Sequence, residues 1–169
     1  AASKIAADKL IESLVHSQGL KATILRPFNT YGPRQSTRAV ISRILQQAFD
    51  PACKVIELGN MNVSRDFTFV TDTVAAFSYA AELGVLGPYN VASGVSTTLL
   101  DLCRLITEKP VKSMHDAIRS EFAEVYDLMG DSSKFRELTG WYPRVSLASG
   151  LIKTADYVLA NKKNMGYLV

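Results

Sequence analysis

The sequence predicts an α/β fold, because short β-prone runs alternate along its 169 residues with segments of helical periodicity. The clearest run is 21–25, and we expect Pro27 to end it because proline cannot donate a hydrogen bond to a ladder. Asn29, Gly32 and Pro33 then favour an irregular turn. Open α/β sheets bind ligands where a buried strand gives way to a loop, so this stretch is the expected centre of a site. An ordinary exit from a strand is the alternative interpretation.

Composition restricts the classes of protein that fit the chain. Apolar residues make up 47% of the sequence and charged residues 21%, which is typical of a globular protein. The net charge is only +3 and the basic residues are scattered singly, whereas nucleic-acid binding needs a clustered basic face. No apolar run approaches the length that spans a membrane, and no signal peptide is visible. We therefore expect neither a nucleic-acid nor a membrane partner.

The cysteines and histidines indicate no special chemistry. Cys53 and Cys103 lie in unrelated segments without C-x-x-C spacing, which favours reduced thiols in a cytoplasmic protein. His16 and His115 are not accompanied by the cysteine, histidine or carboxylate spacing of a metal site. No metal is expected.

The first predicted element is a helix over residues 1–18, which Gly19 would end as a C-terminal cap. Its apolar residues form two adjacent stripes, namely Ala6, Leu10 and Leu14, and Ala7, Ile11 and Val15. Packing against a single partner does not require an apolar face of this width. We therefore expect the helix to cover its own sheet while it also meets another subunit.

The remaining elements follow from periodicity and caps. Helices are predicted over residues 37–49 and from 96 to about 106. Three further helices are predicted to end at residue 83, at residue 140 and at about residue 160. Their expected N-caps are Thr71 or Asp72, Ser96, Asp131 and Ser146. Strands are predicted at 54–58, 65–70 and 88–92, and residues 111–124 show no regular pattern. The N-terminus of the helix over 37–49 follows the loop directly, so its amides could hold a diphosphate, and Trp141 is expected to pack under the last helix.

Three landmarks, in this order, give the chain a resemblance to a known family. Residues 25–34 read L-R-P-F-N-T-Y-G-P-R and match the form L-R-P-x-N-x-Y-G-P-R position by position. Residues 65–67 read R-D-F, and residues 129–134 read M-G-D-S-S-K, with L-T-G-W at 138–141. The chain resembles extended short-chain dehydrogenases, the NAD(P)-dependent nucleotide-sugar epimerases and dehydratases. It is most similar to the sugar-nucleotide 4,6-dehydratases, over nearly its whole length.

The resemblance implies the C-terminal half of such an enzyme. Lys4 matches the lysine of the family's catalytic Tyr-x-x-x-Lys, whose tyrosine would stand immediately before Ala1. The glycine-rich dinucleotide loop and the acidic residue that reads the ribose normally lie far upstream. Residues 1–27 and about 70–92 would then belong to the Rossmann-type dinucleotide-binding domain. Residues 28–69 and 93–169 would form the small α/β substrate-binding part.

The resemblance also assigns Lys4, Pro27 and Phe28 to the cofactor. A lysine one helical turn from a tyrosine lowers the pKa of that tyrosine and can hydrogen-bond the nicotinamide ribose. Phe28 would lie against the nicotinamide. A solvated surface lysine and a core phenylalanine are the alternative interpretations.

A nucleotide-diphosphate sugar is the substrate that the resemblance implies. Asn29 would donate to its diphosphate through an uncharged amide, and the backbone around Leu58 would meet the base. Arg65 and Arg119 would grip the diphosphate, because a guanidinium fork matches phosphate oxygens. Ser120 follows Arg119 where the family usually has proline. The alternatives are a turn asparagine and arginines in surface salt bridges.

Two hypotheses follow from different classes. In the first, the chain is the C-terminal part of an NAD(P)-dependent sugar-nucleotide 4,6-dehydratase or epimerase and forms a homodimer through helix 1–18. The complete enzyme would bind NAD or NADP, whereas this chain alone is expected to bind no cofactor tightly and to be inactive. In the second, it is a non-catalytic truncated module with a binding or oligomerisation role. A tyrosine and a nucleotide fold encoded just upstream of Ala1 would favour the enzyme.

Overall fold

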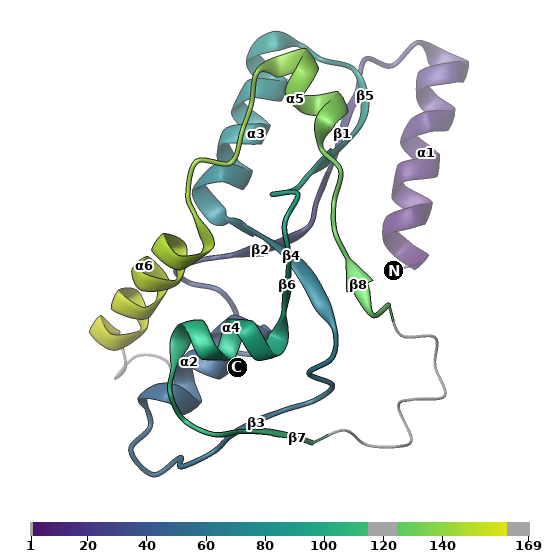
Figure 1. Ribbon diagram of the computed structural model, residues 1–169. Coiled ribbons are helices and arrows are strands. Elements are labelled where there is room, and N and C mark those ends of the chain that lie inside the picture. The colour runs from purple at the N-terminus through teal and green to yellow at the C-terminus, as the bar shows by residue number, and fades with distance from the viewer. Residues whose placement is uncertain (1, 115–124, 162–169) are drawn as a thin grey trace.

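The computed structural model describes residues 2–114 and 125–161, and its mixture of helices and parallel strands confirms the α/β prediction (Figure 1). The helices are α1 (Ala2–Gln18), α2 (Val40–Phe49), α3 (Val70–Leu83), α4 (Leu99–Ile106), α5 (Ser133–Thr139) and α6 (Leu147–Ala160). The strands are β1 (Thr23–Pro27), β2 (Asn29–Tyr31), β3 (Ile56–Leu58), β4 (Ser64–Phe69), β5 (Gly87–Val91), β6 (Ser96–Thr98), β7 (Val111–Ser113) and β8 (Asp127–Leu128).

A first, two-stranded sheet pairs β1 with β5 in parallel, with Leu25 opposite Tyr89. Parallel pairing of these two segments agrees with their expected place in a Rossmann-type domain. Helix α3 packs against β1, and α5 packs against β5 and α3, so both helices lie beside this sheet at one end of the molecule (Figure 1). Helix α1 runs alongside at one side, and none of its described residues is buried.

Strand β1 ends at Pro27, as the sequence predicted. The amide of Phe28 donates to the carbonyl of Val91 at 3.0 Å, so alternate residues of β1 present their amides to β5. Pro27 faces the opposite edge, where the described residues supply no partner strand. A proline costs a strand nothing where no ladder bond is needed.

A second sheet forms around β4, the strand that runs through the middle of the molecule (Figure 1). It pairs with β2 in parallel, with β6 antiparallel and with β8 in parallel. The predicted irregular turn at Asn29 is wrong, because residues 29–31 pair with residues 67–69 as a strand. Ladder bonds to β4 and the burial of Tyr31 outweigh the turn preferences of single residues.

A third, two-stranded parallel pair joins β3 to β7. The strand predicted at 54–58 is shorter, and β7 lies in the stretch that showed no regular pattern. Residues 115–124 of that stretch lie outside the described residues.

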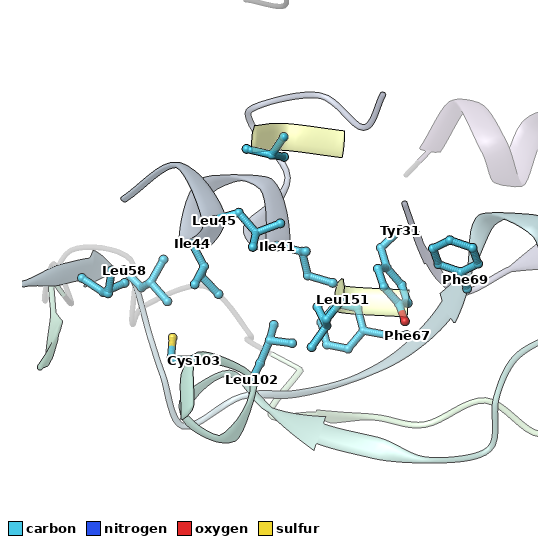
Figure 2. Packing of buried hydrophobic residues seen from close by; sticks show 12 residues of the cluster. Tyr31, Ile41, Ile44, Leu45, Leu58, Phe67, Phe69, Leu102, Cys103 and Leu151 are labelled. Atoms are coloured by element: carbon cyan, nitrogen blue, oxygen red, sulfur yellow. The ribbon is translucent and has the colours of Figure 1, made fainter. Parts of the chain in front are cut away.

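Two clusters of buried apolar residues hold these sheets. The larger cluster joins α2, α4 and α6 to the sheet around β4, and Figure 2 shows Ile41, Ile44, Leu102 and Leu151 pointing toward one another. The smaller cluster joins α3 and α5 to β5, and Trp141 belongs to it. The indole nitrogen of Trp141 donates to the carbonyl of Asp72 at 3.0 Å. Trp141 therefore packs beside α3, and its predicted position under the last helix is wrong.

The helix starts differ from the predictions in four places, and one of them is α5, where Ser132 and not the predicted Asp131 is the N-cap residue. Phe69 precedes α3, and the carboxylate of Asp72 instead accepts a bond from the amide of Val145 at 2.9 Å. Ser96 lies in β6, and Thr98 caps α4 by accepting from the amide of Asp101. Helix α2 begins at Val40 rather than 37. The predicted cap of α6 is confirmed, since the hydroxyl of Ser146 accepts from the amide of Ser149.

Candidate functional site

Three residues predicted to contact a nucleotide sugar lie around one pocket of about 330 Å³, which we call the arginine pocket. These residues are Asn29, Leu58 and Arg65. The complete lining is Asn29, Arg38, Val40, Arg43, Leu58, Gly59, Asn60, Val63, Arg65, Phe67 and Leu99. The pocket thus gathers residues from β2, α2, β3, β4 and α4.

Pairing of β2 with β4 places Asn29 and Arg65 in the same wall. Asn29 lies opposite Phe67 in the ladder, and its side-chain amide nitrogen donates to the carbonyl of Asp66 at 2.8 Å. Arg65 is two residues before Phe67 on the same strand, so the side chains of both point to one face. One of the two amide hydrogens of Asn29 is used by this bond, and the second is the one that could donate to a ligand.

The guanidinium of Arg65 is held in place by the backbone. Its Nη1 donates to the carbonyls of Ser64 and Val125, each at 2.8 Å. A guanidinium has five N–H donors, so these two bonds orient the group without exhausting it. Arg65 is half-buried, which lowers the entropy lost when an anion binds.

Asp66, the next residue of β4, holds the face of that strand that points away from the arginine pocket. Its carboxylate is fully buried and accepts from the amide and the hydroxyl of Ser93, at 2.9 and 2.7 Å. It also accepts from the amides of Gly94 at 2.8 Å and Gly130 at 3.2 Å. Strand alternation puts Asp66 and Arg65 on opposite faces. Asp66 therefore anchors β4 to two neighbouring segments while Arg65 faces the pocket.

Arg38 and Arg43 are pocket residues that the sequence analysis missed. Helix α2 starts beside the pocket, where the amide of Arg43 donates to the carbonyl of Ala39 at 2.9 Å. Val40 and Arg43 are three residues apart and so share the helix face that lines the pocket. The sequence pattern around Arg38 and Arg43 indicates a binding role only weakly, because single arginines at the start of an amphipathic helix are also common on solvated surfaces.

The charged side chains that line the arginine pocket, among the described residues, are all positive. Among the described residues that line it, three are arginines and none is acidic. Guanidinium groups bind phosphate and carboxylate oxygens through a fixed fork of donors. The arrangement is therefore suited to an anion, and Leu58, Val63 and Leu99 supply an apolar wall beside it.

A second pocket, of about 540 Å³, brings together Lys4 and Pro27 and is called the Lys4 pocket. Its other lining residues are Ile5, Asp8, Lys9, Leu25 and Arg26. Arg26 of β1 pairs with Asp8 of α1 at 2.7 Å, and so ties the helix to the strand. Both partners are partly exposed, so the pair contributes at most about 1 kcal/mol.

Phe28 lines neither of these two pockets. The ring of Phe28 lies over Gly130, where an added Cβ would come within 2.9 Å of its Cε2 and 2.2 Å of the Cβ of Ala92. Phe28 therefore packs between the end of β1 and the segment that leads to α5. Arg119 lies outside the described residues.

Tyr31 and Cys103 have side chains that can react, but both are buried in the core. Tyr31 is buried, its hydroxyl donates to the carbonyl of Leu147 at 3.1 Å, and burial followed by the charge of Asp72 raises its pKa. Burial raises the pKa of the Cys103 thiol to about 11, so it is protonated at neutral pH and a poor nucleophile. Both cysteines are free.

The described part of the chain lacks two kinds of feature, a metal-binding cluster and a membrane-spanning helix. It contains no group of three or more histidine, cysteine or carboxylate residues that could hold a metal ion. None of its helices is both long enough and apolar enough to cross a membrane.

A family model described as GDP-mannose 4,6 dehydratase matches residues 1–154. The chain belongs to this family. The GDP-6-deoxy-D-mannose reductase of Pseudomonas aeruginosa is 30% identical over 159 residues, which are 89% of this chain and 52% of that protein. The dTDP-glucose 4,6-dehydratase of Neisseria gonorrhoeae is 30% identical over 175 residues, which cover 95% of this chain and 50% of that protein. The chain spans about half the length of these curated relatives.

Solved structures agree with this membership. The UDP-glucose 4-epimerase of Thermotoga maritima, solved with UDP-glucose, has a TM-score of 0.80 and 27% identity over 95% of this chain and 53% of its own. The dTDP-glucose 4,6-dehydratase of Bacillus anthracis, solved with NAD, has a TM-score of 0.87. It is 22% identical and covers 99% of this chain and 54% of its own, so it supports the fold alone. The predictions of a Rossmann-type α/β fold and of an NAD-dependent epimerase/dehydratase family are confirmed.

Proposed function

We propose that the chain is the C-terminal part of an NAD(P)-dependent sugar-nucleotide 4,6-dehydratase or epimerase, and that the arginine pocket binds the diphosphate of its substrate. The observation that carries this proposal is the meeting of Asn29, Leu58 and Arg65 around one pocket without acidic lining residues among those described. The three come from separate segments of the chain, and the family resemblance had assigned each of them to the same ligand.

Each residue has a role that suits its chemistry. Arg65 supplies a fixed guanidinium for a phosphate oxygen, and Asn29 supplies one uncharged donor. Arg38, which lies just before α2, adds a second cation at the same opening. Leu58 ends β3 and offers backbone and apolar surface to the base. In this proposal residues 28–69 and 93–169 form the substrate-binding part.

Lys4 and Pro27 are the residues that would meet the nicotinamide end of the cofactor. They line one pocket, and Lys4 is exposed there, so the position fits a lysine that hydrogen-bonds a ribose and raises the acidity of a neighbouring tyrosine. The bound nicotinamide would accept and return a hydride. Residues 1–27 and about 70–92 belong, in this proposal, to the dinucleotide-binding domain.

The test is a calorimetric titration of the chain with UDP-glucose, GDP-mannose and dTDP-glucose. Replacing Arg65 by alanine removes charge-assisted hydrogen bonds, each worth about 1.5–3 kcal/mol, so affinity should fall roughly ten- to a hundredfold. Arg104→Ala is the matched control, because Arg104 is exposed on α4, pairs with Asp101 and lies outside the pocket. Equal affinity in the Arg65→Ala variant and the parent would refute the assignment.

A non-catalytic truncated module with an oligomerisation role is the second candidate. It is favoured by α1, none of whose described residues is buried. A catalytic tyrosine and a nucleotide fold encoded upstream of Ala1 would support the enzyme instead.

A further inference from the structure

The arginine pocket holds more positive charge than a nucleotide sugar requires. A sugar nucleotide carries two negative charges, one on each phosphate diester. The pocket presents Arg38, Arg43 and Arg65, with no carboxylate among its described lining residues. Two guanidiniums would neutralise the ligand, so a third is left to be satisfied by solvent or by further negative charge.

Arg43 is the additional cation, and the structure holds its backbone firmly. It lies in the first turn of α2, whose next turn is tied to β3 through Gln47. The side chain of Gln47 accepts from the amide of Glu57 at 2.7 Å and donates to the carbonyl of Glu57 at 3.1 Å. Helix α2 and the end of β3 are thereby locked together as two walls of the same pocket. Arg43 stands on one wall and Leu58 on the other.

The exposure of Arg43 indicates how it acts. Its side chain is exposed at the rim, whereas Arg65 is half-buried and bonded to the backbone. A rim charge works through electrostatic attraction more than through one fixed contact, so its effect grows with the charge of the ligand. A free nucleoside diphosphate carries about three negative charges above pH 7, because a terminal phosphate titrates with a pKa of about 6.

We propose that Arg43 is a specificity-determining residue that makes the arginine pocket prefer ligands with three negative charges over ligands with two. The inference rests on the proposed function for the identity of the ligand, and it deepens that function. A free nucleoside diphosphate, which glycosyl transfer from a nucleotide sugar releases, would then compete with the nucleotide sugar at this pocket. The charge of Arg43 at the rim decides which of these two ligands binds more tightly. The shape of the pocket does not exclude the free nucleoside diphosphate.

The experiment measures dissociation constants of UDP, UDP-glucose and inorganic pyrophosphate for the 169-residue chain at pH 8. The parent chain should bind UDP more tightly than UDP-glucose. Arg43→Gln keeps the size and polarity of the side chain and removes its charge. It should weaken UDP and pyrophosphate binding by roughly three- to tenfold and leave UDP-glucose affinity less changed. Arg104→Gln removes an equally exposed charge from α4, outside the pocket, and should change none of the three constants.

The outcomes separate this inference from the proposed function. If Arg65→Ala weakens UDP-glucose binding while Arg43→Gln leaves the preference for UDP unchanged, the inference is overturned and the function stands. A second outcome is that Arg43→Gln weakens pyrophosphate binding, while UDP and UDP-glucose bind the parent chain no more tightly than pyrophosphate does. The charge selectivity is then supported and the proposed function fails. If Arg43→Gln and Arg104→Gln weaken UDP equally, the effect belongs to net charge, and the inference is overturned.

Discussion

At the residue scale, Arg65 and Asp66 show how one short motif serves two purposes. Arg65 faces the arginine pocket, while Asp66 points to the buried side and accepts bonds from Ser93, Gly94 and Gly130. The pocket-facing residue is therefore positioned by the one beside it. We expect that a change at Asp66 loosens the whole wall of the pocket, whereas a change at Arg65 alters the ligand contact.

The first prediction concerns Asp66→Asn. The asparagine keeps the shape of the side chain but brings an NH₂ group against backbone amides that need an acceptor. Leaving a buried donor unsatisfied costs about 1–3 kcal/mol, so the free energy of unfolding should fall by about 2–4 kcal/mol. Urea denaturation measures it. Asp156→Asn, at an exposed position of α6, is the control and should change stability by no more than about 0.5 kcal/mol. A loss at Asp66 no larger than that of the control would contradict the role as anchor.

The candidate site could be predicted only in part from its residues. Asn29, Leu58 and Arg65 meet in one pocket, and the motif resemblance had already assigned all three to one ligand. Arg38 and Arg43 were missed, because their place depends on where α2 packs and an arginine carries no local signal of that. Lys4 and Pro27 share a pocket as well, and the ring of Phe28 packs over Gly130.

At the element scale, helices were predicted better than their ends, and of the eight described strands only β1, β3, β4 and β5 were predicted. Apolar spacing identified α2 and α4, because burying one face requires that spacing whatever the helix packs against. Caps at Asp72 and Ser96 were wrong, since tertiary partners compete for the same side chains: the carboxylate of Asp72 bonds the distant Val145. The strand β2 was missed because its ladder partner lies 38 residues further along the chain, and a local pattern carries no sign of it.

The second prediction tests the contact between α6 and the sheet around β4. Gly150 lies where an added Cβ would come within 2.1 Å of the Tyr31 hydroxyl and 2.8 Å of Phe69 Cδ2. Gly150→Ala should therefore destabilise the protein by about 1–3 kcal/mol, although alanine favours helix by about 1 kcal/mol. Thermal unfolding measures the change. Gly59→Ala is the matched control, because a Cβ there meets nothing within 4 Å. A Gly150→Ala variant as stable as the control would show that α6 sits further from the sheet.

At the scale of the whole molecule, the proposed cofactor site and the proposed substrate site differ in how much of each the chain supplies. Among the described residues, those that line the arginine pocket all lie between positions 29 and 99. The 169 residues contain no Gly-x-Gly-x-x-Gly motif for a dinucleotide pyrophosphate. We therefore expect this chain by itself to bind NADH weakly, with a dissociation constant above the micromolar range, while it still binds nucleotide sugar. Titration followed by NADH fluorescence measures this, and micromolar binding would contradict it.

The last prediction is that the 169-residue chain associates with itself in solution. Within the described residues the β1–β5 sheet has two strands only, so each of them has one open edge, and an unpaired edge is a template for another chain. Helix α1 adds apolar surface, since Ile5 and Leu10 are 62% and 63% exposed. Apolar patches of this kind rarely stay uncovered on soluble monomers. Both features favour a dimer, edge pairing or exchange of elements between copies.

Light scattering at tens of micromolar is the measurement, and two variants identify the surface. Leu10→Glu places a charge on the exposed side of α1 and should shift the population toward monomer if that helix forms the contact. His16→Glu adds the same charge about a third of a turn away around the helix and should have the smaller effect. If both variants and the parent associate equally, the open edges of β1 and β5 carry the contact, because α1 would then be uninvolved. A parent chain that stays a monodisperse monomer would contradict the prediction as a whole, since neither surface would then be drawing copies together.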